Sequence, residues 1–240
     1  MTTGDCHFPT TSWSRVAHAG DSLDPARRAA LQDLAHAYWY PLYAFIRRQG
    51  HSPDKAADLT QGFFADLLER GGLAVADPNR GRFRSFLLAA CRHYLSHDRE
   101  RDAALKRGGG VSVVSISSVR AEWRFRAEPT HEQTADRLFM RGWALEVLRI
   151  ALERLRADEA GAGRSALFDQ LGPTLTDGRG RSSYDDIGAA LGLSVPAVKM
   201  AASRLRKRYR ALVREEVART VAVEGDVEDE IRDLFAALAG

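Results

Sequence analysis

Residues 182–210, SSYDDIGAALGLSVPAVKMAASRLRKRYR, specify a pair of helices joined by a tight turn. Ser183 is typical of a helix N-cap, and two aspartates follow it where the helix dipole favours negative charge. Gly192 is expected to end this helix, because glycine tolerates the left-handed conformation of a tight exit. Leu193 is expected to point inward at the turn, and Ser194 caps the second helix. The pattern predicts a helix-turn-helix, whose second helix enters the major groove of DNA.

The second of these helices is strongly basic. Between Ile187 and Arg214 the sequence has seven Lys and Arg residues and no acidic residue. A solvated basic surface is the alternative, but a basic helix after such a turn favours contact with DNA. Lys199 and Ser203, near the helix start, are expected to read base edges, and Arg204, Arg206 and Lys207 are expected to hold phosphates. The capping residue Ser194 is also expected to belong to the DNA-binding site.

Composition limits the class of protein. The 240 residues suffice for one large or two small domains, and the net charge of +3 understates a basic excess that is local. Cys6 and Cys91 form no CxxC pattern, which fits a reducing cytoplasm and argues against a zinc ribbon or a disulfide framework. No apolar run has membrane-spanning length, and the N-terminus lacks the build of a signal peptide. Abundant Ala, Leu and Arg predict an all-α fold. The cysteine usage and the absence of a signal-peptide pattern predict a cytoplasmic protein.

The rest of the chain divides into two helical modules joined by a flexible linker. An arm at 1–24 is expected to pack Phe8 and Trp13 on the domain that follows. Pro41 is expected to kink or restart the first helix, because proline lacks an N–H and clashes with the preceding turn. The expected helices run over about 25–40 with a continuation to 48, 53–70, 82–107, 135–157 and 165–171. The domain boundaries that follow are 1–24, 25–107, 108–134 for the linker, 135–214 and 215–240.

The helix expected at 82–107 interleaves aromatic residues with arginines. This composition suits a single strand of nucleic acid, since guanidinium groups hold the backbone while rings stack on bases. Periodicity alone leaves a second interpretation open, in which the aromatic residues form the core and the arginines are solvated.

The final segment, 215–240, is acidic and carries an amphipathic stripe that includes Leu234 and Phe235. A helix this short is marginal alone, so it should dock elsewhere. One hypothesis is that it folds back on one of the two modules and restrains binding. The alternative is an ordinary terminal helix that completes the core.

Three motifs in order resemble the extracytoplasmic-function class of bacterial RNA polymerase sigma factors. DLTQGFFADLLER at 58–70 is similar to the helix by which that family grips the clamp helices of the polymerase β′ subunit. GRFRSFLLAACRHYLSHDRER at 81–101 is similar to its helix for the minus-ten element, and 184–208 to its minus-thirty-five reader. The N-terminal arm and the C-terminal segment resemble a long subgroup with a C-terminal extension.

The resemblance implies a transcription initiation factor with no catalytic residue and no cofactor. Its partners would be core RNA polymerase, promoter DNA and an anti-sigma factor or a regulatory kinase. Polymerase binding is expected at Asp58, Gln61 and Phe64. Contacts with the minus-ten strand are expected at Arg82, Phe83, Arg84, Phe86, Arg92, His93, His97 and Arg99.

Two other functions fit parts of the sequence. A helix-turn-helix repressor or activator would bind duplex DNA, usually as a dimer, without replacing sigma. An enzyme would need a catalytic site. His93 and His97 are one helical turn apart, a spacing that metal ligands can have. No third ligand and no HExxH pattern accompany them, so no metal site is expected.

Overall fold

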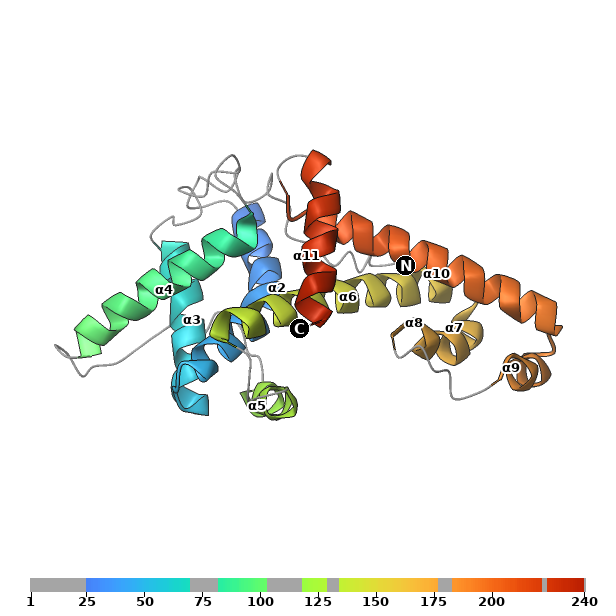
Figure 1. Cartoon of the computed structure of the whole chain (residues 1–240), viewed down its shortest axis with the longest axis horizontal. Coiled ribbons are helices and arrows are strands. Elements are labelled where there is room, and N and C mark those ends of the chain that lie inside the picture. Colours follow the sequence, from blue (N-terminus) through green and yellow to red (C-terminus); the bar gives the residue numbers. More distant parts are fainter. Residues whose placement is uncertain are drawn as a thin grey trace. The chain divides into compact units, whose positions relative to one another are not determined.

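The computed structural model describes residues 25–69, 82–102, 118–128, 134–176, 183–221 and 224–239 (Figure 1). All regular elements in these ranges are helices, which confirms the all-α fold class. Within the same ranges, no helix is both long and apolar enough to cross a lipid bilayer. The arm expected at 1–24, with Phe8 and Trp13, lies outside the described residues.

The helices follow one another with short connections wherever the connection is described. In chain order they are α2 (Pro25–Arg48), α3 (Pro53–Glu69), α4 (Phe83–Asp102), α5 (Ser118–Ala127), α6 (Ala135–Gly161), α7 (Ser165–Leu171), α8 (Pro173–Thr176), α9 (Tyr184–Leu191), α10 (Val195–Ala218), the short 3-10 helix η3 (Glu224–Asp226) and α11 (Val227–Ala239).

The chain forms two compact units. The first contains residues 1–146 together with 217–240, and the second contains residues 147–216. The division therefore falls inside α6 and α10, and the C-terminal helix α11 belongs to the same unit as α2 to α5.

The core of the first unit is aromatic. Tyr38 of α2, Phe83 of α4 and Phe139 of α6 are almost fully buried, and the Tyr38 ring lies 5.7 Å from Phe83 and 6.5 Å from Phe139 between centroids. Trp143, one turn beyond Phe139, is also buried. Cys91 of α4 is fully buried, and burial raises the pKa of its thiol to about 12.

Pro41 lies within α2, which runs unbroken from Pro25 to Arg48, so the restart predicted for this helix does not occur. Gly142 of α6 packs directly against this proline. A Cβ at position 142 would lie 3.2 Å from the Pro41 Cα, tighter than ordinary van der Waals contact. The burial of Pro41 and its neighbours offsets the backbone hydrogen bond that proline cannot make.

The structure corrects the expectation of an irregular linker at residues 118–127, where α5 forms. Glu122 of α5 accepts hydrogen bonds from Arg47 Nε at 2.8 Å, Arg47 Nη2 at 2.9 Å and the Tyr43 hydroxyl at 2.8 Å. The Arg124 guanidinium stacks 3.7 Å from the centre of the Tyr40 ring. A ten-residue helix is marginal alone, and these contacts with α2 stabilise it.

The second unit contains the turn that the sequence predicts. The Ser183 side chain accepts from the Asp186 amide, and the Asp186 carboxylate accepts from the Ser183 amide, which completes a capping box. Gly192 ends α9 with a φ of +64°. The side chain of Leu193, however, is 40% exposed, so the prediction of an inward leucine is wrong. Its backbone makes the turn instead, as its amide donates to the Gly188 carbonyl at 2.9 Å.

Replacing Gly188 by alanine should destabilise this turn by about 1–3 kcal/mol, because the added Cβ would lie 2.6 Å from the Leu193 carbonyl oxygen. Native-state hydrogen exchange of the α9 and α10 amides measures the effect within the second unit. Gly161→Ala is the matched control, since a Cβ there meets nothing within 4 Å. Unchanged exchange in Gly188→Ala would contradict the predicted clash.

Candidate nucleic-acid interface

Helix α10 has one buried side and one exposed side. Val198, Ala202 and Leu205 form the buried stripe, each less than 5% exposed. Ser203 and Lys207 lie on the opposite side and are exposed. With 3.6 residues per turn, the other basic residues fall on the two flanks between these sides. Lys199 and Arg206 share one flank with Arg210, whereas Arg204 and Arg208 share the other.

The first flank of α10 is tied to the start of α9. Arg206 Nη2 donates to the Tyr184 hydroxyl at 2.9 Å, which joins the second helix to the first residue of α9. Lys199 is exposed on the same flank about two turns earlier. Ser194 accepts a 3.4 Å hydrogen bond from the Ala197 amide and so caps α10, as the sequence predicts.

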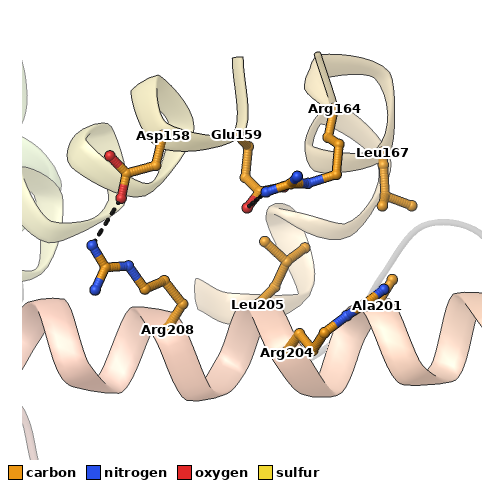
Figure 2. A pocket seen from close by; sticks show the side chains of 8 residues that line it. All are labelled: Asp158, Glu159, Arg164, Leu167, Ala201, Arg204, Leu205 and Arg208. Carbon is orange, nitrogen blue, oxygen red and sulfur yellow. Dashed lines mark hydrogen bonds and ion pairs between the residues drawn. The ribbon is translucent and has the colours of Figure 1, made fainter. Parts of the chain in front are cut away.

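The second flank borders a cavity of about 480 Å³ inside the second unit (Figure 2). Arg208 donates to Asp158 at 3.1 Å, and Arg164 holds Glu159 through two hydrogen bonds of 2.6 and 2.9 Å. These bonds from Arg164 lower the pKa of Glu159, and the charge of Arg204 lowers it further. Arg204 and Arg208 therefore face acidic side chains of their own unit.

Residues expected to contact the minus-ten strand divide into two sets along α4. At the helix start, Phe83 and Arg84 are buried, Arg82 is about one third exposed and Phe86 is half-buried. Further along, Arg92, His93 and His97 are exposed. Arg99 belongs to α4, but its side chain lies outside the described residues.

The exposed set on α4 forms a small polar cluster. The Nε2 atoms of His93 and His97 lie 3.3 Å apart, and Arg92 Nη2 contacts both carboxylate oxygens of Asp136 at 2.5 Å. The Arg92 guanidinium also lies 5.7 Å from the centre of the Phe45 ring. Among the residues that the structure describes, no group of three or more His, Cys, Asp or Glu could hold a metal ion.

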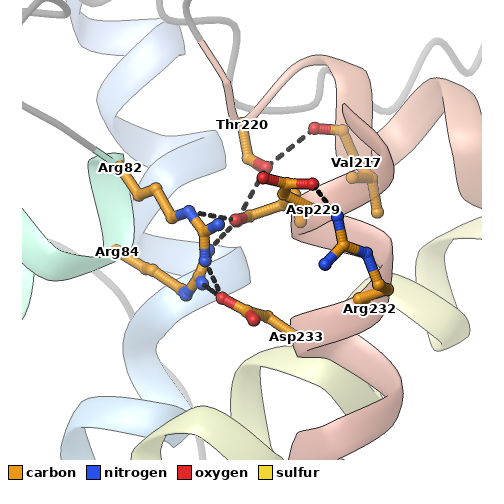
Figure 3. A network of polar contacts seen from close by, with 8 residues as sticks. Arg82, Arg84, Val217, Thr220, Asp229, Arg232 and Asp233 are labelled. Atoms are coloured by element: carbon orange, nitrogen blue, oxygen red, sulfur yellow. Dashed lines mark hydrogen bonds and ion pairs between the residues drawn. The ribbon is translucent and has the colours of Figure 1, made fainter. Parts of the chain in front are cut away.

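The buried set at the start of α4 meets α11 (Figure 3). Arg82 Nε lies 3.0 Å from a Glu230 oxygen, and Arg84 Nη2 donates to Asp233 at 2.8 Å. Arg84 also pairs with Glu230, and its guanidinium lies 4.4 Å from the centre of the Trp143 ring. Burial, followed by the charge of Arg82, lowers the pKa of Arg84 to about 10. The sequence shows an acidic C-terminal segment but not which arginines it meets.

The residues expected to bind polymerase lie at different depths of α3. Asp58 is exposed and Gln61 is half-buried. Phe64 is only 2% exposed and lies 5.5 Å from the Phe63 ring between centroids, so it belongs to the core. The surface that α3 offers thus comprises Asp58 and Gln61 without the Phe64 ring.

Comparison with family models, curated proteins and solved structures finds no match to this chain.

Proposed function

We propose that this chain is a sigma factor of the extracytoplasmic-function type, which binds core RNA polymerase and directs promoter recognition, DNA melting and initiation. The observation that carries the proposal is the α9–turn–α10 arrangement. It has a capping box, a left-handed glycine and a second helix with a basic exposed side, which are the features of a helix-turn-helix. In this proposal the protein is cytoplasmic, is not an enzyme and uses no cofactor.

The second unit would act as the duplex-reading module. Lys199 and Ser203 are near the start of α10, where a recognition helix contacts base edges. Lys207 extends the exposed side and suits a phosphate contact. Arg208 suits this role less well, because its guanidinium already pairs with Asp158.

The first unit would bind polymerase and the melted strand. Asp58 and Gln61 of α3 offer a polar surface to the clamp helices of the β′ subunit. Arg92, His93 and His97 of α4 combine a cation with ring systems, which suits a single strand. Taking bases out of the stack costs a few kcal/mol, and stacking and charge contacts would offset this cost.

Run-off transcription tests the proposal directly. Core polymerase free of sigma is incubated with a pool of promoter-length DNA, with and without this protein. New, specific start sites in the presence of the protein support a sigma factor. Tight duplex binding without start sites and without co-elution with core polymerase contradicts it and favours a repressor or activator. An anti-sigma factor or a kinase is a further partner that the resemblance implies.

Lys207→Ala should weaken duplex binding by about threefold to tenfold and lower the slope of log affinity against log salt by about one. Arg208→Ala is the matched control, as it removes the same charge from the same helix. Its effect should be smaller, because Arg208 pairs with Asp158. Fluorescence anisotropy over a range of salt concentrations measures both variants. Equal losses would contradict the assignment of the exposed side as the DNA-facing one.

A further inference from the structure

The start of α4 holds two arginines that need anionic partners. Arg84 is 3% exposed, and Arg82 is close enough for its charge to lower the pKa of the Arg84 guanidinium. A buried cation beside a second cation is costly unless negative charge is supplied. The structure supplies this charge through two carboxylates, those of Glu230 and Asp233 on α11.

The carboxylates of α11 are arranged around these arginines from one face of the helix. Glu230 is fully buried, lies near both guanidinium groups and also accepts a 3.4 Å hydrogen bond from Thr220. Asp233, three residues later, pairs with both arginines as well. Phosphate oxygens are the other common partners of such arginine pairs, because they accept the same charge-assisted hydrogen bonds.

We propose that α11 is an autoinhibitory helix whose Glu230 and Asp233 occupy Arg82 and Arg84 in place of the phosphates of a single nucleic-acid strand. The inference rests on the proposed function, because the resemblance to sigma factors implies contacts between these two arginines and the minus-ten strand. Strand and α11 compete for the same two guanidinium groups. The unassisted protein therefore binds the strand weakly through this site, and binding requires α11 to leave.

The apolar contacts of α11 set how firmly it is held. Val227 and Leu234 are buried, and Arg141 donates to the Leu238 carbonyl at 3.3 Å. Phe235, by contrast, is 58% exposed, so the predicted apolar stripe is only partly used. A helix of 13 residues is marginal once detached. The contacts that hold α11 are thus few enough for a competing polyanion to displace this helix.

The test compares two full-length double variants that each remove two charges from α11. Glu230→Gln with Asp233→Asn should raise the affinity for a fluorescein-labelled, mixed-sequence single-stranded DNA by about tenfold, within the usual range of coupling between sites. Glu228→Gln with Asp229→Asn is the matched control, because both residues are exposed. It should change the affinity by less than about twofold. Adding Arg82→Gln to the first variant should abolish the gain.

An equal gain in both variants would overturn the proposal, because the effect would then be one of overall charge. No gain in the first variant, with circular dichroism unchanged, would also overturn it.

A second measurement uses the unaltered protein, so it does not depend on how the variants fold. Adding the same single-stranded DNA should increase hydrogen exchange at the amides of 227–239, because the strand must release α11. Unchanged or slower exchange at saturating DNA would overturn the proposal. If the strand releases α11 but run-off transcription with the Glu230→Gln, Asp233→Asn variant yields no start sites, the autoinhibitory contact is upheld and the sigma assignment fails.

Discussion

Glu122→Ala should lower the free energy of unfolding of the first unit by about 2–4 kcal/mol, which makes it one of the two most damaging single changes expected. The Glu122 side chain is 12% exposed and its partner Arg47 is 17% exposed, so the ion pair is largely shielded from water. Removing the carboxylate takes the acceptor from the Tyr43 hydroxyl and takes two hydrogen bonds from Arg47, which keeps its bond to the His51 carbonyl. Denaturant unfolding followed by circular dichroism measures the loss.

Asp136→Ala is the control for this variant. Asp136 also pairs with an arginine of the first unit, but both side chains are about half exposed. Exposed pairs contribute little, so a loss below about 1 kcal/mol is expected. Similar losses in both variants would show that the shielding of Glu122 has no energetic consequence.

The same contact makes the first unit sensitive to acid. Hydrogen bonds from Arg47 lower the pKa of Glu122 from its ordinary value of 4.5 to about 2. A lowered pKa stabilises the folded state fully above pH 4.5, and this contribution disappears as the pH falls from 4.5 towards 2. In the alanine variant, stability should depend less steeply on pH within this window than in the unaltered protein.

Trp143→Ala should cost the first unit about 3–5 kcal/mol, the range for truncating a buried aromatic side chain. Trp143 is 2% exposed, lies one helical turn beyond Phe139 and faces the Arg84 guanidinium at 4.4 Å. Its loss leaves a cavity in the core. It also removes the ring that covers the Arg84 guanidinium. Thermal and denaturant unfolding both report this effect.

Trp123→Ala provides a matched control of the same chemistry. Trp123 belongs to α5 in the same unit but is 78% exposed. Its removal should change the free energy of unfolding by no more than about 0.5 kcal/mol. A large loss in this variant would contradict the exposed position of Trp123.

Local chemistry explains which parts of the fold the sequence predicts well. The Ser183 cap and the Gly192 exit depend on residues at most four positions apart, so the sequence contains all that is needed. The α5 helix depends on partners such as Arg47, 75 residues away from Glu122. A local pattern cannot reveal such a contact, and the sequence therefore predicts an irregular segment there.

Candidate site residues were harder to predict for a related reason. Phe63 and Phe64 are adjacent, yet both are buried, because α3 packs against α2 on one side and α4 on another. The basic residues of α10 are close in sequence, but the helical repeat distributes them over three sides. Only the tertiary structure tells which of these sides meets acidic residues of the same unit.

Because Cys91 is buried, the rate at which its thiol is chemically labelled reports how often the helices around α4 separate. Alkylating reagents react with the thiolate, and a thiol whose pKa is about 12 ionises almost exclusively when the surrounding helices separate. The labelling rate of this cysteine therefore counts openings of the first unit in the intact chain, provided that Cys6 is first replaced by serine. A nucleic-acid strand or a protein that loosens or tightens the unit on binding would change this rate.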